Sequence, residues 1–378
     1  MNRASRPVSA KSHQVHEIQF LRGLAIVFIM VVHAAGDLSH VEVIDTQVAL
    51  RMLFHALTSF GVPLFVLISG FVLYHRYGAD VPLRDFYFRR FGKVLVPYAA
   101  FSVIYLGYAG LENGWFPSPG KCLWKLLTGT SYYHLWFIRL IAQVYLLYPV
   151  LAKFYRHFER RGMARRLLLG ALVFQTFANI GRHVMKELLP NAEILDFVLT
   201  FTRYIFYFLL GMWVSRNRQK LSAAIDRSVK RYALPAVPLY ALLIFLHVQV
   251  LLSGIERHGS TSAIPDIDRI PIVFVRIVTQ IISLIVSYKA VRFLMQRPGV
   301  WSAVILRIGM LSFGFYLLHP LMLSIVIRML EQWFSLGLRN ILSFPLNFIL
   351  TAVSTYGVIS FINRTPFSEL LLGKARRE

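Results

Sequence analysis

The 378-residue sequence is poor in cysteine and in charged residues, and each scarcity excludes a class of protein. Cys122 is the only cysteine, which excludes an intramolecular disulfide framework and a cysteine-rich metal site. Charged residues make up 16% of the chain, against about 25% in soluble domains. Because 56% of the residues are hydrophobic, the composition also excludes an ordinary water-soluble enzyme.

Acidic residues are scarce as well, with 18 Asp and Glu against 41 Lys and Arg and a net charge of +23. Such an excess is typical of proteins that bind nucleic acid or a membrane. The basic residues are spread over six segments instead of forming one stripe, which argues against nucleic acid. The long apolar runs favour membrane lipid as the partner.

A membrane-spanning helix needs roughly 20 mostly apolar residues. Ten such stretches occur, so the sequence predicts an all-α, polytopic helix bundle with about ten transmembrane helices. The stretches lie near residues 18–36, 52–74, 94–111, 135–152, 167–181, 197–214, 232–252, 271–288, 308–327 and 341–362.

Lysine and arginine are distributed unevenly among the segments that separate these stretches. Alternate segments, beginning with the N-terminal one, carry 28 of the 41 basic residues, whereas the five intervening loops carry nine. Because cytoplasmic loops hold the excess of Lys and Arg, the pattern predicts that both termini are cytoplasmic. The remaining four basic residues lie inside apolar stretches: Arg22, Arg139, Arg203 and Arg276.

The loops are short, and no extended linker separates one part of the chain from another. We therefore expect a cytoplasmic tail over residues 1–17, a single transmembrane domain over 18–363 and a cytoplasmic tail over 364–378. The first apolar stretch is too long for a signal peptide and lacks a cleavage site of small residues.

Arg22 and His33 lie eleven residues apart in the first apolar stretch. At about 100° per residue, eleven steps return close to the same helix face, about 16 Å further along the axis. Ionisable groups at membrane depth usually face a cavity and mark function. Asp37 follows one turn beyond His33 and is a candidate to fix its tautomer. The alternative is that Arg22 reaches lipid phosphate groups and His33 bonds a neighbouring helix.

Two further candidates lie near the second and third stretches. Ser69 belongs to the run SFGVPLFVLISGFVL, whose small residues predict close helix packing or, alternatively, a cavity lined by unwound backbone. Arg89, Arg90 and Lys93 stand among aromatic residues before the third stretch. Such a cluster suits a polyphosphate ligand, whereas spacing alone favours an anchor on anionic lipid.

Histidines and aromatic residues mark the predicted outer half of the bundle. His134 and Trp136 open the fourth stretch, and Tyr316 and His319 lie in the ninth. Aromatic residues at this depth usually form an interfacial belt. His33, His134 and His319 show none of the short spacings typical of metal ligands, so no metal site is expected.

Five of these motifs, taken in order, resemble acyltransferase family 3. They are the helix with Arg22 and His33, the run GVPLFVLISGF, the segment RRFGK before VPY, HLW followed by YLLYP, and SFGFYLLHP. The resemblance spans about residues 19–320. Within that family, the chain is similar to the branch of transferases that act on enterobacterial common antigen and exopolysaccharide.

This resemblance implies a multi-pass enzyme of the bacterial inner membrane. Such an enzyme takes an acyl group, most often acetyl, from cytoplasmic acyl-coenzyme A and passes it to a hydroxyl of a cell-surface glycan or its lipid-linked precursor. Acyl-coenzyme A is then a substrate, and no permanently bound cofactor is expected. The resemblance gives His33 and Arg22 the places of the family's essential histidine and arginine. Arg89, Arg90 and Lys93 match its coenzyme-phosphate segment.

The chain departs from the family pattern in the fourth helix. Many members carry a glutamate pair there, and this chain has Ile141 and Ala142 instead. This removes one group that would orient His33, and Asp37 is the expected substitute.

The chemistry expected of these residues is general-base catalysis. A sugar hydroxyl needs a base to attack a thioester, and neutral histidine, with an intrinsic pKa of about 6.5, is suited to that work. Hydrogen-bond donors near the oxyanion would lower the barrier, and Ser69, His134 and His319 are candidates. Trp136 and Tyr316 are expected beside them in the acceptor pocket. An acyl-histidine intermediate is an open alternative.

Two other functions are compatible with charged residues inside helices. A proton-coupled exporter of a glycan intermediate or small carboxylic acid would use intramembrane His and Arg, but it needs no coenzyme site. A structural scaffold for polysaccharide assembly predicts no effect of His33→Ala.

Overall fold

Helices account for the secondary structure of the computed structural model, and no strand occurs in the residues that it describes. Those residues are 10–36, 45–188, 195, 197–258, 265, 267–297, 299–336 and 342–373. The predicted all-α class is therefore confirmed.

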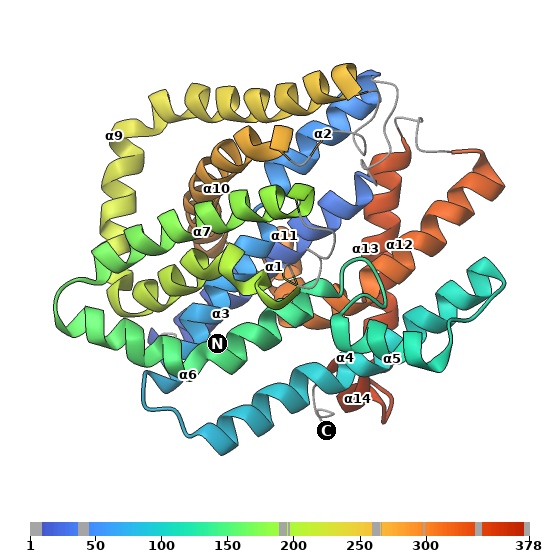
Figure 1. Ribbon diagram of the computed structural model, residues 1–378, viewed down its shortest axis with the longest axis horizontal. Coiled ribbons are helices and arrows are strands. Elements are labelled where there is room, and N and C mark those ends of the chain that lie inside the picture. The colour runs from blue at the N-terminus through green and yellow to red at the C-terminus, as the bar shows by residue number, and fades with distance from the viewer. Residues whose placement is uncertain are drawn as a thin grey trace, which may run out of the picture.

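The helices cross one another in a bundle whose central member is α1, which runs through the middle of the molecule (Figure 1). In chain order the elements are α1 (Ala10–Ala34), α2 (Thr46–Thr58), α3 (Gly61–Tyr77), α4 (Leu83–Asn113), α5 (Pro119–Thr128), α6 (Trp136–Arg160), α7 (Ala164–Leu188), the 3-10 helix η1 (Thr200–Tyr204), α9 (Ile205–His258), the 3-10 helix η2 (Ile267–Arg269), α10 (Ile270–Gln296), α11 (Val300–Met310), α12 (Ser312–Phe334), α13 (Ser343–Ile362) and α14 (Ser368–Leu372).

Eight helical segments in the described part of the chain are long and apolar enough to cross a membrane. The predicted stretches 167–181 and 197–214 are not among them. The first lies in α7, whose Gln175 and Asn179 lower its hydropathy, and the second begins with η1 instead of a full helix. The protein is a polytopic membrane bundle, and the count of ten spans stays a prediction.

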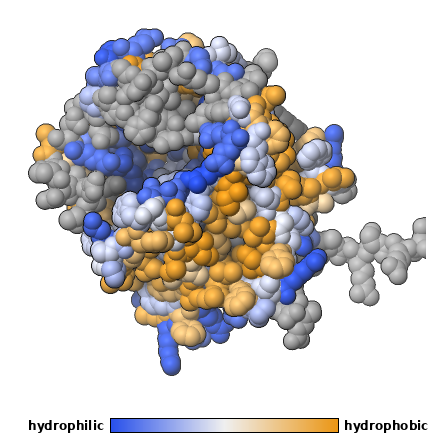
Figure 2. Space-filling model, turned by 90° about the vertical axis from the view of Figure 1, so that its right-hand side faces the viewer, coloured by the Kyte–Doolittle hydropathy of each residue, from blue (hydrophilic) through white to orange (hydrophobic). Residues whose placement is uncertain are grey.

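The outward-facing side chains fit a lipid environment. Leu111, Val150 and Val353 are each at least 65% exposed although they are aliphatic. Figure 2 shows one face on which hydrophobic residues form a broad area, with hydrophilic residues gathered above and below it. A surface of this kind is stable against hydrocarbon and unstable against water.

The predicted stretch 52–74 is not one helix, because the chain breaks between α2 and α3. Ser59 caps the C-terminus of α2, and α3 begins at Gly61. Pro63 then falls in the first turn of α3, where the missing N–H leaves no hydrogen bond unmade. The run therefore contains a break between two helices, and its glycines also pack closely against other helices, as at Gly70 and Phe208.

Three helices extend into segments that the sequence analysis treats as tails or loops. Helix α1 begins inside the predicted tail 1–17, α11 occupies part of the predicted loop 289–307, and α14 begins the predicted tail 364–378. Helix α11 packs against α1, and α14 packs against α4. These segments therefore contribute to the bundle.

Glycines allow two pairs of helices to cross with their backbones in contact. At Gly211 of α9, a Cβ atom would collide with the carbonyl oxygen of Leu67 in α3, and Gly70 faces the Phe208 carbonyl in the same way. Helices α1 and α11 meet similarly at Gly23 and Gly309. Small residues at such crossings are what lets membrane helices approach closely.

Gly211→Ala is expected to destabilise the fold, because the rigid Leu67 carbonyl leaves no room for a methyl group. The expected cost is about 1–3 kcal/mol of unfolding free energy, the usual range for overpacking. Thermal unfolding in detergent measures it. Gly170→Ala is the control, since a Cβ at Gly170 meets no atom within 4 Å. Equal melting temperatures for the two variants would contradict the close crossing.

Asp226 links α9 to α10 through two ion pairs. Its carboxylate accepts from Lys289 Nζ at 2.6 Å and from Arg292 Nη1 at 2.7 Å. These hydrogen bonds, that of Lys289 first, hold the pKa of Asp226 below its ordinary value of 3.8. Because the folded-state pKa is lowered, the stabilisation is present above the unfolded-state pKa and is lost as pH falls through the folded-state pKa.

We expect Asp226→Asn to melt below the wild type at pH 7, with the difference closing as pH falls below about 4, near the ordinary pKa of an aspartate. Melting curves of both proteins between pH 7 and pH 3 check this. A difference that is constant over this range would show that the Asp226 charge contributes nothing.

Candidate active site

Arg22 and His33 lie on the same helix, and each lines its own cavity. The Arg22 cavity, of about 180 Å³, is formed by α1, α3, α4, α6 and α12 and is bordered by Arg22, Ser69 and Tyr145. The His33 cavity, of about 220 Å³, lies among α1, α2, α7, α9 and α10 and is bordered by His33, His134 and Trp136. Both side chains therefore border cavities, and the catalytic roles expected of them stay predictions.

Phe137 of α6 and Tyr316 of α12 line both cavities. The cavities therefore adjoin, with these two aromatic side chains as their common wall. A ligand long enough to reach from Arg22 to His33 would have to pass beside that wall.

Three histidines from distant parts of the chain converge at the His33 cavity. The His33 ring lies 5.3 Å from that of His319, and the His319 ring lies 5.9 Å from that of His134, measured between ring centroids. The Tyr133 ring meets the His33 ring edge-on at 5.0 Å. Among the described residues, no group of three His, Cys, Asp or Glu side chains is arranged to hold a metal ion.

The hydrogen bonds of His319 fix its tautomer. Its Nδ1 lies 2.7 Å from the carbonyl oxygen of Phe315, which only accepts, so Nδ1 carries the proton. The Nε2 atom of neutral His319 is then an acceptor, and it is buried without a hydrogen-bond partner. Neutral His319 therefore has no N–H to offer an oxyanion.

His134 differs from His319, because both of its ring nitrogens are buried without partners. Neutral imidazole carries one N–H whichever tautomer is present. His134 can therefore donate one hydrogen bond to a group in the cavity. The hydroxyl of Tyr316, by contrast, is already engaged, since it donates to the carbonyl oxygen of His134.

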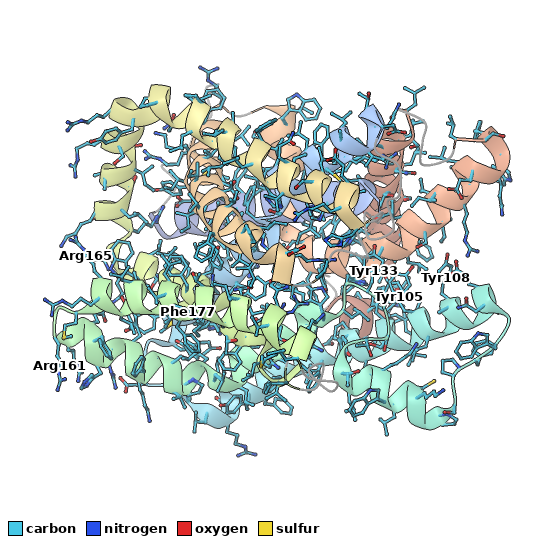
Figure 3. The ribbon with its side chains drawn as sticks, turned by 45° about the horizontal axis from the view of Figure 1, so that its top comes forward. Tyr105, Tyr108, Tyr133, Arg161, Arg165 and Phe177 are labelled. Atoms are coloured by element: carbon cyan, nitrogen blue, oxygen red, sulfur yellow. The ribbon has the colours of Figure 1, made fainter. Side chains whose placement is uncertain are left out.

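Tyr105 contacts the turn of α12 that contains Pro320. Its hydroxyl donates to the Leu317 carbonyl at 2.7 Å and accepts from the Leu321 N–H at 3.2 Å. The proline removes one helical N–H and so disturbs this turn. Figure 3 shows Tyr105 and Tyr133 near each other, whereas Arg161 and Arg165 lie at the opposite end of the molecule.

His33 is in the last turn of α1, which ends at Ala34. Asp37, the expected orienting group, lies outside the described residues. Within them, His319 and Tyr133 pack against the His33 ring.

The other predicted site residues divide between the two cavities. Trp136 and Tyr316 line the His33 cavity with His134, whereas Ser69 lies in the Arg22 cavity and donates to the Phe65 carbonyl at 2.9 Å. Ser69 is therefore separated from the histidines that it was expected to assist.

The basic cluster lies on α4, next to the Arg22 cavity that Val94 borders. Arg89 and Lys93 are exposed, and Arg89 pairs with Asp85 at 3.9 Å. Arg90 is half-buried, stacks over Tyr77, and is close enough to Arg22 for their charges to interact. The structure thus brings Arg90 and Arg22 together and leaves Arg89 on the surface.

Several polar residues of the His33 cavity have no role predicted from the sequence, namely His55, Gln175, Asn179, Arg203, Arg276 and Gln280. One signal was present, because Arg203 and Arg276 are two of the four basic residues inside apolar stretches. Their convergence depends on how η1 and α10 pack, which no local pattern contains.

Comparison with known proteins identifies one family. The acyltransferase family 3 model, described as an acyltransferase domain, matches residues 15–364. No curated protein and no solved structure matches the chain.

The two cavities are expected to open to opposite sides of the membrane. Both test cysteines are introduced into a Cys122→Ser background. Ser69→Cys, in the Arg22 cavity, should react with a membrane-impermeant thiol reagent in inside-out vesicles. Ser59→Cys, in the His33 cavity, should react with the same reagent in right-side-out vesicles. After labelling in the vesicles, each variant is purified and its labelled fraction is measured by mass spectrometry. Reaction of both cysteines from the same side would contradict this arrangement.

Proposed function

The chain belongs to acyltransferase family 3, and on that premise we propose that it moves an acyl group, acetyl in the first instance, from acyl-coenzyme A to a hydroxyl group. The acceptor is a cell-surface glycan or its lipid-linked precursor, and the enzyme works in the bacterial inner membrane. The observation that carries the proposal is that Arg22 and His33 line adjoining cavities along one helix.

The Arg22 cavity suits the donor. Arg22 and Arg90 supply two guanidinium groups within electrostatic range of each other, and Arg89 and Lys93 add charge at the nearby surface. Guanidinium groups bind phosphate through paired hydrogen bonds. With the coenzyme's phosphates at this end, its flexible arm would extend past Phe137 and Tyr316 towards His33.

His33 suits the role of general base. Neutral imidazole accepts the proton of the acceptor hydroxyl while the hydroxyl oxygen attacks the thioester carbonyl carbon. The resulting tetrahedral intermediate collapses, the carbon–sulfur bond breaks, and the coenzyme leaves as a thiolate. The imidazolium then gives its proton to that thiolate, which restores neutral His33 and yields ester and free thiol.

His134 is the donor best suited to the oxyanion of that intermediate. It has one N–H with no partner, it is only 2% exposed, and it borders the cavity that His33 borders. A hydrogen bond in such a water-poor site stabilises developing charge strongly. Ser69 lies in the other cavity, and His319 is an acceptor at Nε2, so His319 is better suited to hold His33 in position.

His33→Ala is expected to lower acetyl-coenzyme A turnover in nanodiscs by about 10²- to 10⁴-fold, the contribution of a general base. Coenzyme binding should be retained, because His33 lies beyond the common wall from Arg22. His16→Ala is the matched control, since His16 is an exposed histidine of the same helix. Release of free thiol measures turnover, and equilibrium dialysis with labelled coenzyme measures binding.

Two arginine variants test the donor site by equilibrium dialysis with labelled coenzyme. Arg90→Gln should weaken coenzyme binding more than Arg89→Gln, because Arg90 is within electrostatic range of Arg22 whereas Arg89 is exposed and pairs with Asp85. The proposal is overturned if the wild type neither binds nor consumes acetyl-, propionyl- or longer acyl-coenzyme A with lipid and glycans present. That outcome would favour the proton-coupled exporter.

A further inference from the structure

The His33 cavity has further polar residues besides His33 and His134. Four segments contribute to this polar wall: His55 from α2, Gln175 from α7, Arg203 from η1, and Arg276 and Gln280 from α10. The transfer chemistry proposed above uses none of these side chains. Among the residues that the structure describes, no aspartate or glutamate borders the cavity.

Arg276 gives this wall a positive charge. Arg276 lies six residues into α10, about 9 Å along the helix at 1.5 Å per residue. In the ranges that the structure describes, it forms no ion pair, whereas Arg292 of the same helix pairs with Asp226. An arginine at membrane depth usually pairs or faces a pathway, because an isolated buried charge is costly.

Neutral groups beside Arg276 are held in fixed positions by hydrogen bonds. Gln280 accepts from the Tyr207 hydroxyl at 2.7 Å, and its amide reaches the Ser59 carbonyl where α2 and α3 separate. Gln175 accepts from the Phe206 N–H at 3.1 Å. A wall fixed in this way is preorganised for a polar ligand, which reduces the entropy lost on binding.

His55 connects this wall with the reaction centre. It lies close enough for electrostatic interaction with Arg276 on one side and with His33 on the other. A ligand group held at Arg276 would therefore belong to a molecule whose other end reaches His33. The volume of about 220 Å³ suits one sugar ring or a polar group of similar size.

We propose that the acceptor carries an anionic group, a carboxylate or a phosphate, which binds at Arg276 while the hydroxyl to be acylated lies at His33. The inference rests on the proposed acyltransferase function and specifies its acceptor class. The charge of Arg276, which has no carboxylate partner among the described residues, favours an anion over a neutral glycan, and the guanidinium fork matches the oxygens of a carboxylate or a phosphate.

The test compares acceptor probes that differ in charge. Methyl glucuronide and glucose 1-phosphate are the anionic probes, and methyl glucoside is the neutral one. Each is added to the protein in phosphatidylcholine nanodiscs, and binding is measured by calorimetry in parallel with acyl transfer. A second arm replaces phosphatidylcholine with phosphatidylglycerol, which separates an anionic lipid headgroup from a water-soluble anion as the source.

The wild type should prefer the anionic probes by about tenfold or more, the effect of one charge-assisted hydrogen bond. Arg276→Gln should abolish most of that preference, and Arg276→Lys should restore part of it by returning the charge. Arg297→Gln is the matched control, because Arg297 is an exposed arginine just beyond the other end of α10. If an anionic lipid headgroup is the group that binds at Arg276, then Arg276→Gln changes acyl transfer in phosphatidylglycerol nanodiscs and not in phosphatidylcholine nanodiscs.

Equal binding of anionic and neutral probes by the wild type, in both lipids, would overturn the inference. An equal effect of Arg276→Gln and Arg297→Gln would do the same. Either result with acetyl-coenzyme A still consumed leaves the acyltransferase function standing. Failure of the wild type to consume any acyl-coenzyme A contradicts the proposed function instead. In that case the calorimetric comparison of charged and neutral probes still decides whether the anion site exists.

Discussion

The rigidity of α1 is the constraint on which the rest of the site depends. A helix satisfies its own backbone hydrogen bonds, so inside a membrane it acts as a fixed spacer. Arg22 and His33 are therefore held on one face at about 16 Å along the axis. Gly23 and Gly309 bring the backbone of α11 against the same helix, which fixes α1 laterally. The two cavities take their positions from this spacer.

Around that helix, the two cavities differ in the kind of polar group that lies near them. Guanidinium groups gather near the Arg22 cavity, and imidazole rings gather where His33 ends α1. Phe137 and Tyr316 stand between them. In a low-dielectric bundle, such a division would keep the phosphates of the proposed donor away from His33, the proposed base.

Much of this site was predictable because helix geometry is local. The shared face of Arg22 and His33 follows from their spacing, and the importance of His134 and His319 follows from the cost of polar groups at membrane depth. The break between α2 and α3 and the presence of α11 were not predictable from hydropathy. Hydropathy measures the apolar length of a segment, and a broken helix with Pro63 in its first turn is as apolar as an unbroken one.

The sequence by itself determined that the chain is a membrane helix bundle, which residues lie on one face of α1, and which motifs resemble a membrane acyltransferase. Only the tertiary structure decided that Ser69 lies apart from the histidines, that His319 is an acceptor at Nε2, and that Arg203 and Arg276 border the same cavity as His33. The physical reason is that these facts depend on contacts between residues far apart in the chain. Such contacts are set by side-chain packing between helices, which the periodicity of each helix does not contain.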